Sequence, residues 1–239
     1  MSKKSKICIC STPIRDIPST CPPFSAMAII QALQGMGENP DFYHTDYFRP
    51  SDEEITEYFQ QNKYDIVGIS TIVSTSYCEL KKYAKIIKKC NPKTIVIVGG
   101  HIVASAKIIL DKCSIDYCVI GDGEKTIKNL LEEIYKGTPS DKSLMAIPGI
   151  SFIDSKGEFK FTGWGIAPDA AEIQSTDFSI LEKLGCLDYY LPTDSSWLDL
   201  SYRQNDPYSN FPFSDKSNKD FKNMKSASVI SSRGCVAKC

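Results

Sequence analysis

Small and hydroxyl-bearing residues follow several of the apolar runs in this sequence. Glycine permits positive φ and lets the backbone approach a bulky ligand, while serine and threonine hydroxyls can hydrogen-bond to it. At the ends of neighbouring parallel strands, such residues would line a ligand crevice. The candidate binding residues are Ser70, Thr71, Ser74, Gly99, Gly100, Gly121 and Gly123. The alternative interpretation is that these glycines merely make turns after strands.

A second set of candidates is the cysteine pair at the end of the sequence, Cys235 and Cys239. Three thiolates from one short loop hold a [4Fe–4S] cluster with one iron open, whereas a fourth thiolate would close it. With ten cysteines in the chain, such a spacing also arises by chance. This pair, however, directly follows an expected strand that ends in Ser-Arg-Gly, after a complete α/β pattern. We therefore interpret both thiols as candidate cluster ligands.

Other cofactor chemistries lack their sequence motifs. The sequence contains neither GxGxxG nor GxxxxGK[ST], which disfavours nicotinamide dinucleotides and nucleoside triphosphates. Ser70 stands where a phospho-receiver domain would have its acceptor aspartate. Flavin binding rests on analogy of fold alone, and one fold hosts many functions.

Alternating strand and helix patterns must position these residues. Apolar runs predict strands at 6–10, 41–44, 65–70, 94–100 and 116–121. Helical spacing and capping patterns predict helices at 24–36, from 51 onwards, at 76–90, at 102–111 and at 123–137, with capping boxes at Ser51 and Ser76. Right-handed crossovers then favour an α/β fold of the flavodoxin-like (Rossmann-type), doubly wound kind. Its five-stranded parallel sheet should have the order 2-1-3-4-5.

The second half of the chain shows no further α/β unit. Residues 148–153 and 158–162 flank Ser155-Lys156-Gly157 and predict a β-hairpin appendage. From 186 to 225, aromatic, proline and polar residues interleave without a period, which predicts a long ordered connector or lid. Residues 227–231 resemble one more strand.

Composition excludes several classes of partner. With 28 basic and 29 acidic residues, the chain has no net field for nucleic acid or an anionic bilayer. The apolar run near the start is too short for a secretory signal, and no run approaches the roughly 18 residues of a membrane span. We therefore expect a cytoplasmic protein without nucleic-acid or membrane partners. Its cysteines, such as Cys8, Cys10, Cys90 and Cys118, should be reduced thiols.

Taken in order, these segments resemble the cobalamin (B12)-dependent radical S-adenosylmethionine (radical SAM) enzymes. The matching stretches are Pro22-Pro23, DIVGIS, IVIVGGH, IDYCVIGDGE, IPGI at 147–150 and SVISSRGCVAKC at the end. No single stretch is diagnostic, but their order and spacing are specific. The resemblance implies a cobalamin-binding α/β domain at 1–140, a hairpin and connector at 141–225, and the truncated start of a radical SAM domain at 226–239.

The resemblance also implies roles for individual residues. The corrin ring or its nucleotide tail would be bordered by Ser70, Thr71, Ser74, Gly99, Gly100, His101, Gly121, Gly123 and Glu124. The loop 11–23 would lie near the lower face of the corrin. Cys235 and Cys239 would be the first two ligands of a CxxxCxxC motif whose third cysteine is absent, so the chain looks like a fragment. His101 has a plainer alternative role as a hydrogen-bonded turn residue.

One departure from other cobalamin-binding domains concerns that loop. The DxHxxG motif is missing, because Asp16 is followed two residues later by Pro18. No histidine of the loop could then ligate cobalt from below. We therefore expect a base-off or water-ligated form of the cofactor.

Three functions stay open at this stage. The first is the cobalamin-binding part of a radical SAM methyltransferase, which would use methylcobalamin, a [4Fe–4S] cluster, S-adenosylmethionine, an electron donor and an unknown substrate. The 239-residue chain by itself should be inactive. The second is a non-catalytic flavodoxin-like module for another cofactor such as flavin. The third is a methylthiotransferase, in which Cys8, Cys21 and Cys78 would have to hold a cluster.

Overall fold

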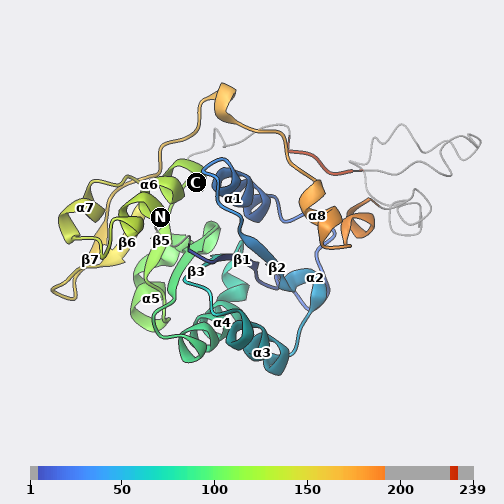
Figure 1. Ribbon diagram of the computed structural model, residues 1–239, viewed down its shortest axis with the longest axis horizontal. Coiled ribbons are helices and arrows are strands. Elements are labelled where there is room, and N and C mark those ends of the chain that lie inside the picture. Colours follow the sequence, from blue (N-terminus) through green and yellow to red (C-terminus); the bar gives the residue numbers. More distant parts are fainter. Residues whose placement is uncertain (1–4, 192–226, 231–239) are drawn as a thin grey trace, which may run out of the picture. The chain divides into compact units, whose positions relative to one another are not determined.

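The computed structural model describes residues 5–191 and 227–230 (Figure 1). The chain forms two compact units, one of residues 1–19 and 23–176 and the other of residues 20–22 and 177–239. All seven strands formed by the described residues belong to the first unit. In the second unit, α8 (Ser179–Lys183) buries two of its apolar side chains, Ile180 and Leu181. The candidate binding residues therefore all come from the first unit, apart from the terminal cysteines.

Five parallel strands form the main part of the sheet, and their order confirms the predicted 2-1-3-4-5 arrangement. The strand β1 (Ile7–Ser11) pairs with β2 (Asp41–His44) on one side and β3 (Ile66–Ser70) on the other. Next to β3 come β4 (Ile95–Gly99) and β5 (Tyr117–Val119). Central strands covered on both faces are expected to be apolar throughout, and all five residues of β1 are buried. The carboxyl ends of these strands meet at one edge.

The predicted hairpin is present, but the expectation that it is an appendage was wrong. Its first strand, β6 (Ile150–Ile153), pairs antiparallel with β5, and β7 (Phe159–Phe161) pairs antiparallel with β6. The result is one seven-stranded sheet. The physical reason is that β5 would otherwise be a sheet edge with unpaired backbone groups, which β6 covers.

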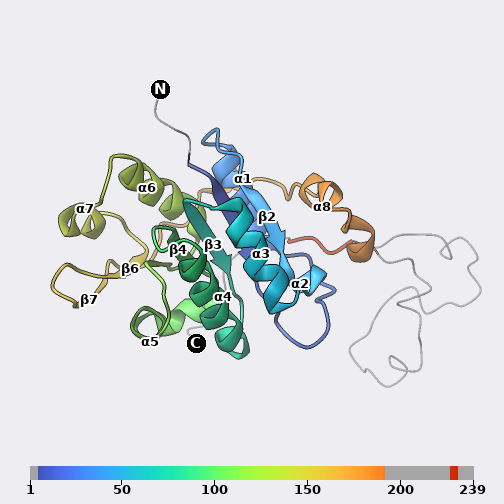
Figure 2. The same cartoon turned by 60° about the horizontal axis from the view of Figure 1, so that its bottom comes forward.

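Helices cover both faces of the sheet (Figures 1 and 2). One face carries α3 (Asp52–Asn62), α4 (Tyr77–Cys90) and α5 (Ala106–Lys112), whose apolar residues share a core with alternate residues of the strands. On the other face, α1 (Phe24–Gln34) packs beside α6 (Gly123–Tyr135). Side chains alternate between the faces of a strand, so strands that are apolar except at their last residue, such as β1 and β3, supply both cores.

Two capping boxes were predicted and one is confirmed. Ser51 accepts a hydrogen bond from the Glu54 amide, and the Glu54 carboxylate accepts one from the Ser51 amide. The capping box at Ser76 was wrong. Its hydroxyl donates instead to the Pro13 carbonyl at 2.7 Å, so a long-range contact replaces the local cap.

Short helical segments that were not predicted from the sequence lie between the main elements. They are α2 (Thr45–Phe48), α7 (Asp141–Met145) and 3₁₀ turns at Ser74–Ser76, Ala170–Glu172 and Leu187–Tyr190. A further 3₁₀ turn, His101–Ser105, falls where a helix was predicted. The predicted helix at 102–111 is thus a 3₁₀ turn followed by α5. None of the helices in the described part of the chain is long and apolar enough to cross a membrane.

Some expectations fall on residues outside the described ranges. They concern most of the connector, 192–226, and the cysteines Cys235 and Cys239. Residues 227–230 are described and have no regular secondary structure, so the strand predicted there was wrong over those residues. The domain boundaries at 140 and 225 stay predictions.

Candidate functional site

The carboxyl edge of the sheet is built from three strand ends at one level. Ser11, Ser70 and Gly99 are register partners across β1, β3 and β4. Because two of these residues have short side chains and Gly99 has none, few side-chain atoms project beyond the strand ends at the centre of the sheet, and we call this stretch the low edge. The Ser70 hydroxyl lies 3.3 Å from that of Ser25 in the first turn of α1, which ties the helix start to the strand end. Sequence reasoning did not single out Ser25.

Thr71 joins the neighbouring strands just above this level. Its amide donates to the Gly99 carbonyl at 3.0 Å, and its hydroxyl accepts a hydrogen bond from the Thr12 hydroxyl at 3.1 Å. Thr71 is fully buried. Thr71 therefore stabilises the carboxyl edge from inside the protein, and a ligand at this edge would contact the residues around Thr71 instead.

Gly100 and Gly99 have different structural requirements. Gly100 has φ 94°, and a Cβ there would lie 2.8 Å from the carbonyl carbon of Thr71. Gly99 has no positive φ, and a Cβ there would meet only the Val119 carbonyl oxygen, at 4.0 Å. Gly100 is thus required by the turn itself, whereas Gly99 leaves open space at the edge.

The turn after β5 is crossed by the segment that leaves β7. Gly121 has φ 85°, and a Cβ there would lie 3.2 Å from the Gly165 nitrogen. The Gly165 amide donates to the Ile120 carbonyl at 2.9 Å. Gly123 and Glu124 then open the first turn of α6. Gly121 and Gly165 allow these two backbone segments to touch, so part of the role of Gly121 is structural.

Two further candidates lie beyond the strand ends. Ser74 and His101 each begin a 3₁₀ turn and are exposed. The structure thus brings all nine predicted binding residues to the carboxyl ends of β3 and β4, to the turns after β3, β4 and β5, and to the start of α6. The two predicted cluster ligands, Cys235 and Cys239, lie outside the described residues.

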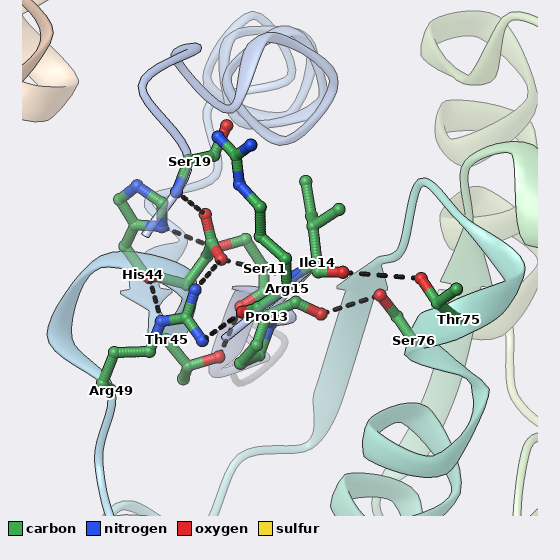
Figure 3. A network of polar contacts seen from close by, with 11 residues as sticks. Ser11, Pro13, Ile14, Arg15, Ser19, His44, Thr45, Arg49, Thr75 and Ser76 are labelled. Carbon is green, nitrogen blue, oxygen red and sulfur yellow. Dashed lines mark hydrogen bonds and ion pairs between the residues drawn. The ribbon is translucent and has the colours of Figure 1, made fainter. Parts of the chain in front are cut away.

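Sequence reasoning missed a polar network at the end of β2 (Figure 3). Asp46 is 3% exposed and accepts hydrogen bonds from the amides of Ile14 at 3.2 Å and Ser19 at 3.0 Å. Arg49 pairs with the Asp46 carboxylate at 2.8 Å. The available signal was the charged Asp46-x-x-Arg49 spacing directly after a strand that should lie beside β1.

His44 belongs to the same network and is buried at the end of β2. Its Nδ1 and the Ser11 hydroxyl are hydrogen-bonded at 2.6 Å, and its ring stacks on Phe42. Burial, and secondarily the Arg49 charge, lowers the pKa of His44 to about 4. The imidazole is therefore neutral at physiological pH.

The described cysteines are free thiols. Cys8 and Cys10 are fully buried in β1, and burial raises the pKa of Cys10 to about 12. No group of three or more His, Cys, Asp or Glu residues able to hold a metal ion occurs within residues 5–191 and 227–230. A cluster at Cys8, Cys21 and Cys78 would require opening β1, so the methylthiotransferase reading finds no support.

The comparisons with known proteins bear on this edge directly. A protein-family model for the B12 binding domain matches residues 11–131, just over half of the 239-residue chain. The chain belongs to the B12-binding domain family. The matched part of this B12-binding domain runs from the last residue of β1 into α6. It includes every candidate residue at the strand ends.

Solved structures share the fold of this B12-binding domain. The cobalamin-dependent S-adenosylmethionine radical enzyme OxsB, with aqua-cobalamin and S-adenosylmethionine bound, has a TM-score of 0.63 and 16% identity; the match covers 79% of this chain and 26% of OxsB. The radical S-adenosylmethionine methyltransferase TsrM from Kitasatospora setae, with cobalamin and a [4Fe–4S] cluster bound, has a TM-score of 0.56 and 18% identity. That match covers 71% of this chain and 31% of TsrM.

One curated relative is similar in sequence. The uncharacterized methyltransferase PH0819 of Pyrococcus horikoshii is 36% identical over 90 residues, which cover 37% of this chain and 18% of that protein. The matched part therefore spans less than a third of PH0819, OxsB or TsrM.

The residues at the carboxyl edge have the chemistry that a large polar cofactor such as cobalamin would need. The central strand ends present Ser70 and Gly99 side by side, and a Cβ on Gly99 would still meet nothing closer than 4.0 Å. Hydroxyls and backbone amides flank this low stretch, and such groups hydrogen-bond to the amide and phosphate groups of a large cofactor.

Proposed function

We propose that this B12-binding domain holds cobalamin at the carboxyl edge of its sheet. The observation that carries the proposal is the register of Ser11, Ser70 and Gly99, which leaves a low edge within the matched residues 11–131. The exposed parts of Ser70, Ser74 and the turns at Gly99–Gly100 and Gly121–Glu124 would contact the cofactor. Thr71 would support them from below.

We further propose that the domain serves a radical SAM enzyme of the methyltransferase type. Support comes from OxsB and TsrM, two cobalamin-binding radical S-adenosylmethionine proteins that share this fold, and from the sequence similarity to the methyltransferase PH0819. Bound cobalamin would supply methyl-transfer chemistry, and the protein would bind and orient it. Cys235 and Cys239 would contribute to a [4Fe–4S] cluster that works with S-adenosylmethionine. An electron donor and the substrate belong to the whole enzyme, and we expect it in the cytoplasm.

An anaerobic titration with aqua-cobalamin tests the first proposal. The visible bands should shift from those of free aqua-cobalamin, in which benzimidazole ligates cobalt from below, to those of a base-off form with water or no ligand on that face, with saturation at one equivalent. Flavin mononucleotide is the matched competitor, because a flavodoxin-like fold also suits it. Saturation with flavin and indifference to cobalamin would overturn the proposal in favour of the flavin-binding alternative.

The iron–sulfur proposal needs a separate test in the full-length protein. C235A and C239A variants should lose iron and the broad absorbance of a [4Fe–4S] cluster after reconstitution, yet keep cobalamin binding. C90A, which changes a free cysteine at the end of α4, away from the terminal motif and the candidate cofactor edge, is the control. A full iron content in C235A or C239A would contradict the ligand assignment.

A further inference from the structure

Residues 12–19, the first part of the connection between β1 and α1, are held from two sides and are called the 12–19 loop below (Figure 3). On one side, the Ser76 hydroxyl donates to the Pro13 carbonyl at 2.7 Å, and the Thr75 hydroxyl donates to the Ile14 carbonyl at 3.4 Å. On the other side lie Asp46 and Arg49 of the segment after β2. The loop is thus fastened through its backbone.

The Asp46 carboxylate binds the 12–19 loop at two backbone amides. One carboxylate oxygen accepts from the Ile14 amide and the other from the Ser19 amide, five residues further along. A carboxylate on a side chain that is 5% exposed is costly unless it is paired and hydrogen-bonded. Here the loop amides and Arg49 satisfy it, so the charge and the loop conformation depend on each other.

Arg49 completes the fastening with three nitrogens. Its Nε donates to the Asp46 carbonyl at 2.6 Å, one terminal nitrogen donates to the Asp46 carboxylate at 2.8 Å, and the other donates to the Arg15 carbonyl at 2.7 Å. This use of a planar fork is specific to arginine, because lysine offers a single ammonium group.

The loop so fastened begins at the candidate cofactor edge. The Thr12 amide donates to the Ser70 carbonyl at 3.2 Å, and the Thr12 hydroxyl donates to Thr71. The loop contains no histidine, so an imidazole–metal bond cannot position it. Its shape must come from the protein contacts around it.

We propose that Asp46 and Arg49 are positioning residues for cobalamin binding, which fold the 12–19 loop before the cofactor arrives. The inference rests on the proposed function. A loop that is already ordered loses less conformational entropy when a ligand binds. The latch formed by Asp46 and Arg49 therefore raises affinity without touching the cofactor.

The test combines amide hydrogen exchange and cobalamin titration on D46N, R49Q and R49K. Exchange at the amides of Ile14 and Ser19 should accelerate at least about tenfold in D46N, because local opening no longer breaks a charged hydrogen bond. The dissociation constant for aqua-cobalamin should rise by about tenfold or more in D46N and R49Q. R49K should not restore affinity, because it keeps the charge and loses the fork.

The control is E133Q, which breaks another i,i+3 ion pair, Glu133–Lys136, at the C-terminal end of α6. It should leave exchange of the loop amides and cobalamin affinity unchanged. Arg49 is partly exposed, so its variants stay informative if D46N does not fold. If R49Q and R49K fold and their loop amides exchange faster, yet both bind cobalamin with wild-type affinity, the inference is wrong. Failure of the wild-type protein to bind cobalamin would instead overturn the proposed function.

Discussion

Gly100 packs directly on the peptide of Thr71: a Cβ at Gly100 would lie 2.8 Å from the Thr71 carbonyl carbon. The same residue has φ 94°. Because Thr71 is hydrogen-bonded to Thr12 and to the Gly99 carbonyl, it has little freedom to move away. The turn after β4 therefore needs glycine for both its conformation and its packing.

The first prediction compares G100A with G37A. Gly37 also has positive φ, 81°, but a Cβ there meets nothing within 4 Å. G37A should cost about 1 kcal/mol of unfolding free energy for the left-handed conformation alone. G100A should cost about 2 to 4 kcal/mol, because overpacking adds to that strain. Urea unfolding measures both, and equal losses would show that the Thr71 contact is not tight.

The second prediction concerns Gly99, where the edge is open. G99L should weaken cobalamin binding by about tenfold or more, because its side chain would occupy space that the ligand needs. Its unfolding free energy should change by less than about 1 kcal/mol, since Gly99 has no positive φ. G99A adds only a methyl group and is the milder control. A spectroscopic titration with cobalamin measures the affinity of both variants. Unchanged affinity in G99L would place the cofactor elsewhere.

The third prediction is a loss of stability in acid from His44. Its pKa in the folded protein is lowered to about 4 from 6.5, so between these values the unfolded chain binds a proton that the folded chain does not. Stability should therefore fall as the pH drops from about 6.5 to 4, by at most about 3 kcal/mol.

Unfolding in urea at several pH values checks this linkage. H44Q removes the titrating group, so its unfolding free energy should depend less on pH over that window. The chain has one other histidine, His101, and H101Q, which keeps His44, should retain the loss. An unchanged pH dependence in H44Q would contradict the assignment.

The fourth prediction is that S151A stabilises the protein. Ser151 is fully buried in β6. Within the described residues, its hydroxyl oxygen is the buried side-chain polar atom that has no hydrogen-bond partner. Removing an unsatisfied buried hydroxyl should raise the unfolding free energy by about 1 kcal/mol.

The matched comparison is T94V at another buried hydroxyl. Thr94 donates to the Tyr64 carbonyl at 2.6 Å, so its loss should lower the unfolding free energy by about 1 kcal/mol. Thermal and urea unfolding should therefore give opposite signs for the two variants. Destabilisation by S151A would mean that its hydroxyl is satisfied in solution.

Much of the edge was predictable because its signals are local. The fully apolar runs around Cys8, Val67 and Val96 predicted buried parallel strands, and right-handed crossovers then restricted their order. Once that order is known, Ser70 and Gly99 must fall side by side at the carboxyl edge. Loops after neighbouring strands meet by topology alone.

The sequence by itself determined the alternation of elements, the order of the five parallel strands and the small residues at their ends, because these depend on periodicity and chain connectivity. Only the tertiary structure decided that β6 covers the edge of β5, that Ser76 binds Pro13 instead of capping its helix, and that Asp46 with Arg49 fastens the loop after β1. Each of these joins residues far apart in sequence or on separate elements. Such contacts are selected by the need to pair buried polar groups, which no local pattern records.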